Sequence, residues 1–122
     1  MRTLRFDDSP VGKTRFEILF HGLIILGNQN TQKGLAVLRR EISLLDKLEG
    51  ISKLCECGKK IGDEPDRELD FSKDTPEIKI DDHEFDLLYD YVSRVPWSIG
   101  KSGRDAVQTL EWLKNSNDHK TN

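Results

Sequence analysis

The sequence lacks both a long hydrophobic run and a recognisable leader. No uninterrupted stretch of apolar residues exceeds four, as in Leu23–Leu26, whereas a helix that crosses a bilayer needs about 20 apolar residues. The opening segment, Met1–Asp8, also lacks the basic-then-apolar order of a secretory signal peptide. We therefore expect a protein that stays in the cytoplasm of the cell that makes it and has no membrane partner.

Cysteine is scarce, because the chain contains only Cys55 and Cys57. A disulfide between residues so close in sequence would close a small, strained ring, so we expect reduced thiols. The alternative is a metal site completed by His21 or His83. Structural zinc sites usually take their thiolates from a C-x2–4-C motif and need a second pair of ligands, whereas the motif here is C-x-C and stands alone. The sequence predicts no cofactor, and metal binding by the two cysteines stays open as the alternative.

Sequence motifs typical of enzymes are missing too. There is no Gly-x-Ser-x-Gly segment to present a nucleophilic serine. Gly100–Gly103 reads Gly-Lys-Ser-Gly, like the end of a phosphate-binding loop, but Val95 stands where that loop needs its first glycine. Acidic residues crowd positions 63–86, yet acids on one solvated surface share one environment, whereas acid–base catalysis needs carboxyls held in different environments. We therefore predict no catalytic residues and no enzyme.

Length and composition predict one domain, residues 1–122. The 122 residues are 35% apolar and 34% charged, which allows a single core within the usual size of a domain. Residues 1–54 carry nine Lys and Arg against six Asp and Glu, whereas residues 55–96 carry six against thirteen. The acidic middle argues against a broad nucleic-acid-binding face there. A nucleic-acid contact would instead use the basic residues of the N-terminal half: Arg2, Arg5, Lys13, Arg15, Arg39 and Arg40.

The beginning of the chain predicts a short strand and a long helix. We expect a strand over residues 3–6 and a turn over residues 7–12, where proline and glycine interrupt the pattern. Thr14–Glu17 fits a capping box, which would open an apolar helix that reaches about residue 26. The alternative for residues 14–27 is a hairpin that turns at His21-Gly22, because apolar residues also alternate there. Either structure places this segment in the core.

The next segment, from about residue 32 to 49, is the clearest helix of the sequence. Its predicted seam is formed by Leu35, Leu38, Ile42 and Leu45, flanked by Leu44 and Leu48. This helix carries more apolar surface than one small layer covers, and such a surplus is typical of a subunit contact. The candidate protein-contact residues on this helix are therefore Leu35, Leu38, Ile42 and Leu45.

The middle of the chain predicts a loop followed by a hairpin. Glycine, proline and charged residues dominate positions 55–66, which favours a loop. Residues 68–71 and 77–80 then alternate between apolar and polar side chains, and residues 72–76 between them read as a turn. We therefore predict a small antiparallel hairpin whose apolar face rests on the helices.

Two further helices are expected after the hairpin. Asp81 and Glu84 form an acidic capping box that opens a helix to about Arg94. Ser102 with Asp105 predicts the start of a last helix, and the tail over 115–122 is polar and expected to fray. The inward face of that last helix is predicted to be Ala106, Val107, Leu110 and Leu113. The predicted fold class is thus α+β and mainly helical, with two helix pairs separated by a small antiparallel β-hairpin.

Two stretches together carry a resemblance. Leu38–Glu49 ends a helix in the style R-x-I-x-x-L-D-x-L-E, and Ile78–Val92 runs from a strand through an acidic cap into a helix, followed by Trp97 and a closing helix. This order is similar to small accessory proteins encoded by tailed bacteriophages and prophages. The resemblance implies a non-enzymatic protein that binds other proteins, in virion assembly or against a host system, in the host cytoplasm or the virion.

These observations favour a protein–protein interaction module that binds itself or another protein. Trp97, which follows Pro96 just past a helix end, is the further candidate contact residue. The alternative for Trp97 is a lid over the core. The alternative for the whole chain is a nucleic-acid-binding regulator that uses the basic N-terminal half.

Overall fold

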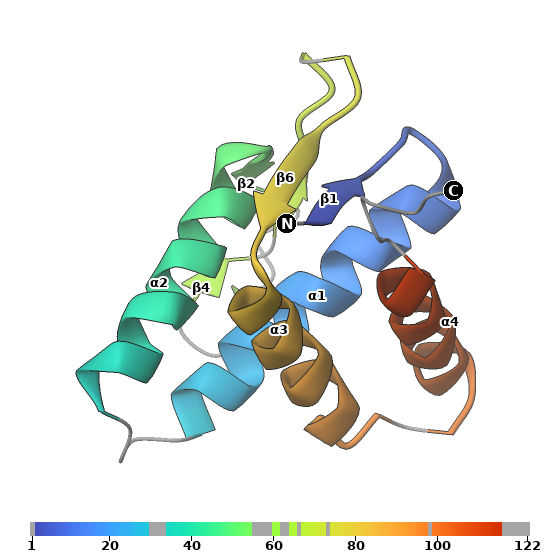
Figure 1. Ribbon diagram of the computed structural model, residues 1–122. Coiled ribbons are helices and arrows are strands. Elements are labelled where there is room, and N and C mark those ends of the chain that lie inside the picture. Colours follow the sequence, from blue (N-terminus) through green and yellow to red (C-terminus); the bar gives the residue numbers. More distant parts are fainter. Residues whose placement is uncertain are drawn as a thin grey trace.

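Four helices and three two-stranded sheets make up the part of the chain that the computed structural model describes, residues 2–29, 34–54, 60–61, 64–65, 67–72, 74–97 and 99–115 (Figure 1). The helices are α1 (Pro10–Gln29), α2 (Leu35–Gly50), α3 (Asp82–Arg94) and α4 (Lys101–Asn115). All three sheets are antiparallel. The predicted fold class, α+β and mainly helical, is confirmed.

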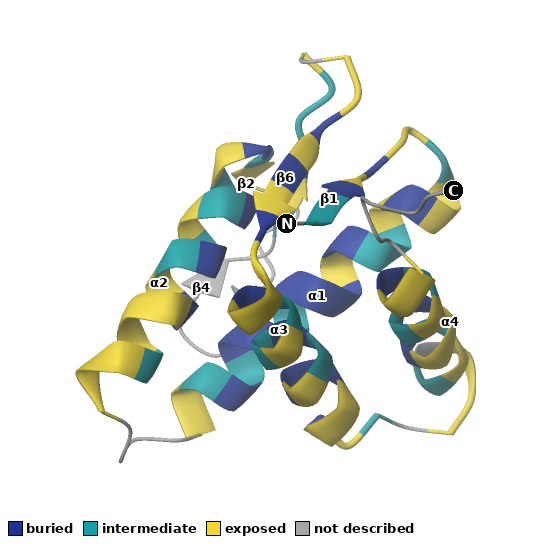
Figure 2. Ribbon diagram, viewed as in Figure 1, coloured by how far each residue is buried: buried dark blue, intermediate teal, exposed yellow. Residues whose placement is uncertain are grey.

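α1 lies at the centre of the fold, and the other three helices pack against it (Figure 1). A Cβ atom at Gly22 would lie only 3.0 Å from a methyl carbon of Val92, so this glycine allows α1 and α3 to cross closely. The helix predicted to follow Thr14 is therefore confirmed, and the alternative hairpin over residues 14–27 is wrong. Apolar side chains are buried on most sides of α1 (Figure 2): Phe16, Ile18, Leu19, Phe20, Leu23, Ile24 and Leu26.

The start of α1 differs from the prediction. The helix begins at Pro10, inside the predicted turn, because proline fits the first helical position, where its missing N–H costs nothing. Ser9 caps it: its Oγ accepts a hydrogen bond from the Gly12 N–H at 3.0 Å, and Asp7 accepts one from the Ser9 N–H at 3.1 Å. The pattern at Thr14 therefore lies inside the helix and is no cap.

The strands do not form the predicted hairpin. β6 (Glu77–Ile80) pairs with β1 (Arg2–Arg5), and β5 (Arg67–Leu69) pairs with β2 (Ser52–Leu54). The two segments expected to pair with each other instead pair with different, earlier strands, because alternation of apolar and polar residues predicts a strand but not the strand with which it pairs. The predicted loop over 55–66 also contains two short paired strands, β3 (Lys60–Ile61) and β4 (Glu64–Pro65).

α3 and α4 follow the prediction more closely. The capping box of α3 is confirmed: the Glu84 N–H donates to Asp81 Oδ1 at 2.7 Å, and the Asp81 N–H donates to Glu84 Oε1 at 3.0 Å. α4 begins after Gly100, whose φ of 137° suits glycine. On α4, Val107 is exposed and Thr109 is buried in its place, so the predicted inward face is wrong at Val107. Residues 116–122 of the predicted tail lie outside the described residues.

Candidate protein-contact surfaces

Two buried carboxylates join α2 to α3. Glu84, which is 4% exposed, accepts hydrogen bonds from Lys47 Nζ at 2.7 Å and from Ser43 Oγ at 2.8 Å. Glu41, which is 7% exposed, accepts a hydrogen bond from the Tyr91 hydroxyl. Burial, together with this hydrogen bond to the Glu41 carboxylate, raises the pKa of Tyr91. Both carboxylates are thus engaged within the chain, and they fix which side of α2 faces the core.

This fixed rotation corrects the predicted seam of α2. The buried side carries Glu41, Leu44 and Leu48, while Leu45 is only half-buried. Three of the four residues predicted as the seam lie on the outer side of the helix, which Figure 2 shows as largely exposed. We call these three residues the α2 ridge: Leu35, 69% exposed, Leu38, 38% exposed, and Ile42, 48% exposed.

The α2 ridge is regularly spaced along the helix and borders a small hollow. Its members follow one another at i, i+3 and i+7, the spacing with which an amphipathic helix enters a groove on its partner. Leu38 and Ile42 also border a small hollow of about 160 Å³ between α1 and α2, which Leu23 and Leu45 help to line. The ridge and hollow together leave apolar surface uncovered along one side of the helix.

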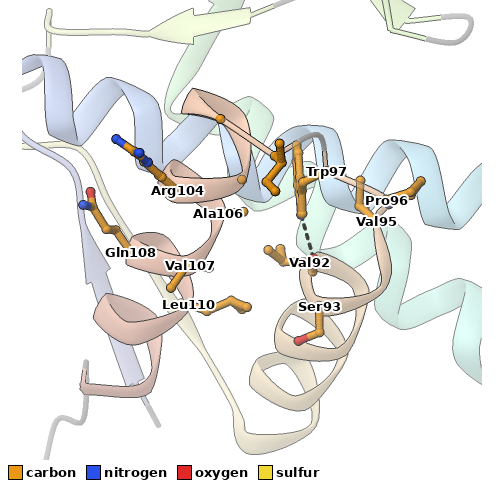
Figure 3. Close-up of a pocket in the computed structure, with 13 residues that line it drawn as sticks. Val92, Ser93, Val95, Pro96, Trp97, Arg104, Ala106, Val107, Gln108 and Leu110 are labelled. Carbon is orange, nitrogen blue, oxygen red and sulfur yellow. Dashed lines mark hydrogen bonds between the residues drawn. The ribbon is translucent and has the colours of Figure 1, made fainter.

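A larger groove lies between α3 and α4, on the segment that joins them (Figure 3). We call it the α3–α4 groove. Its volume is about 950 Å³, and most of its lining side chains are apolar. Two of them stand open to solvent, Ile99 at 99% and Val107 at 57% exposure. Arg104 is the single charged residue among the described residues that line it.

Trp97 forms one wall of the α3–α4 groove. Its indole N–H donates to the Val92 carbonyl at 2.9 Å, which holds the ring against the end of α3 (Figure 3). The ring is half-buried and packs against the core. Trp97 therefore covers the core and also lines the groove, and its role as a protein contact stays a prediction.

Most of the basic residues considered for nucleic-acid binding are engaged within the chain. The Arg2 guanidinium lies 3.8 Å from the centre of the Phe85 ring, and Arg15 lies 5.0 Å from that of Trp112. Arg5 and Lys13 form ion pairs with Glu77 and Asp8 at 3.4 and 3.7 Å. The remaining two, Arg39 and Arg40, are exposed on α2.

The residues considered as metal ligands do not come together in the described part of the chain. Cys55 and Cys57 lie outside the described residues, His21 packs beside the Phe20 ring, and His83 is exposed in the first turn of α3. Within the described ranges, no three His, Cys, Asp or Glu side chains gather as a metal site would require. In the same part of the chain, every helix is too short or too polar to span a bilayer.

The α3–α4 groove is the surface that sequence reasoning missed. Its lining combines two helices and their connection, and Val107 was expected to point inward. The only local sign in the sequence is the apolar pair Trp97 and Ile99, which follows Pro96 between two predicted helices.

No protein-family model, curated protein or solved structure matches the chain. Function is therefore inferred from the α2 ridge, from the α3–α4 groove and from the resemblance that the sequence carries.

Proposed function

We propose that this protein is a non-enzymatic protein–protein interaction module that self-associates through the α2 ridge. The observation that carries the proposal is the outward position of Leu35, Leu38 and Ile42 on a helix whose rotation two buried carboxylates hold. Full burial of one such side chain stabilises a contact by roughly 1.5–3 kcal/mol. Covering three of them at once offsets a substantial part of the entropy cost of association.

The sequence resemblance adds a biological setting to this proposal. The module belongs to a bacteriophage or mobile element, and it acts in virion assembly or on a host protein. The α2 ridge overlaps Leu38–Glu49, one of the two stretches that carry the resemblance.

Sedimentation velocity across a wide concentration range tests self-association. We expect the unmodified chain to shift from monomer to a larger species as concentration rises. Leu38→Ser weakens the association about tenfold, because it removes apolar area from the ridge. Arg40→Ser, on the same helix but away from the ridge, is the matched control and changes little. A chain that stays monomeric at every concentration contradicts the proposal.

The alternative, a nucleic-acid-binding regulator, rests on Arg39 and Arg40, since the other four basic residues have partners within the chain. Electrostatic binding to nucleic acid is strongest at low salt. A gel-shift experiment at low salt that detects no complex removes this alternative.

A further inference from the structure

The same molecule presents a convex apolar surface and a concave one, on different helices. α2 and α4 lie on opposite sides of α1 (Figure 1), so the α2 ridge cannot reach the α3–α4 groove of its own chain. We infer that the α2 ridge of one copy docks into the α3–α4 groove of a second copy. This inference rests on the proposed self-association and names the partner surface.

Shape favours this pairing over a contact between two ridges. The groove, at about 950 Å³, is concave and lined mainly by apolar side chains, including Val92, Trp97 and Leu110. Amphipathic helices dock into apolar grooves through side chains at i, i+3 and i+7, which is the spacing of the α2 ridge. A contact between two ridges would place convex surfaces together and leave Ile99 and Val107 in water. Docking of the ridge into the groove covers both apolar surfaces in one contact.

Charge fixes the direction in which the helices meet. Arg39 and Asp46, seven residues apart, lie along α2 beside the ridge, and Arg104 and Glu111, also seven apart, lie along α4 beside Val107. Seven helical residues span about 10.5 Å, so both pairs have the same separation. All four side chains are exposed, and none forms an ion pair with another described residue.

An antiparallel approach of α2 to the neighbour's α4 therefore sets opposite charges face to face. Arg39 then lies opposite Glu111, and Asp46 lies opposite Arg104. A parallel approach would instead bring like charges together, which is unfavourable. Nearby charges that have partners within the chain, such as Lys101 with Asp105 at 3.2 Å, do not enter this match.

Because the ridge and the groove are different surfaces, the contact is heterologous. Each copy in a docked pair still has one free ridge or one free groove, so association continues into a ring or an open chain. An isologous contact between two ridges would end at a dimer. This difference makes the inference testable by mixing.

Two variants break the two surfaces separately: Ile42→Lys on the ridge and Val107→Lys in the groove. Both positions are exposed, so each variant should fold, which circular dichroism checks. We expect each variant alone to be monomeric in sedimentation velocity. A one-to-one mixture should form a dimer that grows no further, because one intact ridge and one intact groove remain.

The other results overturn the inference and are distinguishable. If Val107→Lys still associates like the unmodified chain while Ile42→Lys does not, the ridge meets another ridge, and only the proposed function survives. A mixture that stays monomeric, or variants that both still associate, also contradicts docking into the groove. If the unmodified chain is monomeric throughout, both the inference and the proposed function fail.

A charge exchange tests the antiparallel direction. Asp46→Arg and Arg104→Asp should each weaken association about fivefold, as loss and reversal of an exposed ion pair predict. The two changes combined in one chain restore the pair with its charges exchanged and return the affinity to near its original value. Arg40→Asp, a charge reversal away from the ridge, is the control. A double variant as weak as the single ones contradicts this direction.

Discussion

α1 and α2 are both rich in apolar residues, yet they have opposite positions in the molecule. α1 is surrounded by α2, α3 and α4, so its apolar side chains are buried on most sides. α2 has the core on one side only, where Leu44 and Leu48 are buried, whereas Leu35, Leu38 and Ile42 face outward. An apolar helix becomes core only where enough neighbours cover it, and the surplus on α2 is what makes it a candidate for contact with another chain.

The largest expected effect tests the core position of α1. Phe20 is fully buried and stacks on Phe16 with ring centres 5.8 Å apart. Phe20→Ala should lower the free energy of unfolding by about 3–5 kcal/mol, because it leaves a cavity that the core cannot fill. Urea denaturation measures this loss. Val11→Ala, on the exposed side of the same helix, should change stability by less than about 0.5 kcal/mol; similar losses in both variants would remove the contrast.

The second prediction concerns the contact that sets the rotation of α2. Tyr91→Phe removes the hydroxyl that donates to the buried Glu41 carboxylate. We expect the free energy of unfolding to fall by about 1–3 kcal/mol, because Glu41 stays buried with one donor fewer. Urea denaturation near neutral pH measures the effect, and an unchanged stability would show that this hydrogen bond does not hold the helix.

The raised pKa of Tyr91 adds a pH dependence to the same contact. The unfolded chain loses the Tyr91 proton at a lower pH than the folded chain does, so the unfolded state gains relative stability as pH rises above about 10. The stability associated with Tyr91 is therefore complete below about pH 10 and is lost above it. Denaturation between pH 8 and about 11 should show a steeper loss in the unmodified chain than in Tyr91→Phe. Tyr89→Phe, which leaves Glu41 untouched, should keep the steep loss.

The smallest expected effect on folding is at the α2 ridge. Leu35 is largely exposed, so Leu35→Ser should change the free energy of unfolding by less than about 0.5 kcal/mol. Denaturation at low protein concentration is the measurement, since association would otherwise add to apparent stability. A large loss would place Leu35 in the core and make α2 resemble α1.

Local patterns predicted the helices well and their exposed faces poorly. Asp81 and Glu84 sit three residues apart and satisfy each other's backbone, so the start of α3 could be read directly. The same pattern at Thr14 gave a wrong start for α1, because the helix begins earlier, at Pro10, where Ser9 caps it. A cap pattern predicts a helix nearby, but competing caps in one segment cannot be ranked without the backbone.

The misplaced seam of α2 has a different cause. Glutamate is a residue type usually found at the surface, and the burial of Glu41 depends on Tyr91, fifty residues away in the chain. The apolar spacing alone centres the seam on Leu35, Leu38 and Ile42, whereas the buried side of the helix carries Glu41, Leu44 and Leu48. The residues named as contact candidates were nonetheless those that lie exposed, except for the half-buried Leu45.

By itself the sequence determined where the helices lie, because capping, proline placement and apolar spacing act within a few residues. Only the tertiary structure decided which strands pair, which side of α2 faces water and that α3 and α4 enclose a groove. Those outcomes depend on contacts between residues far apart in the chain, such as β1 with β6 or Glu41 with Tyr91, and no local sequence pattern predicts such contacts.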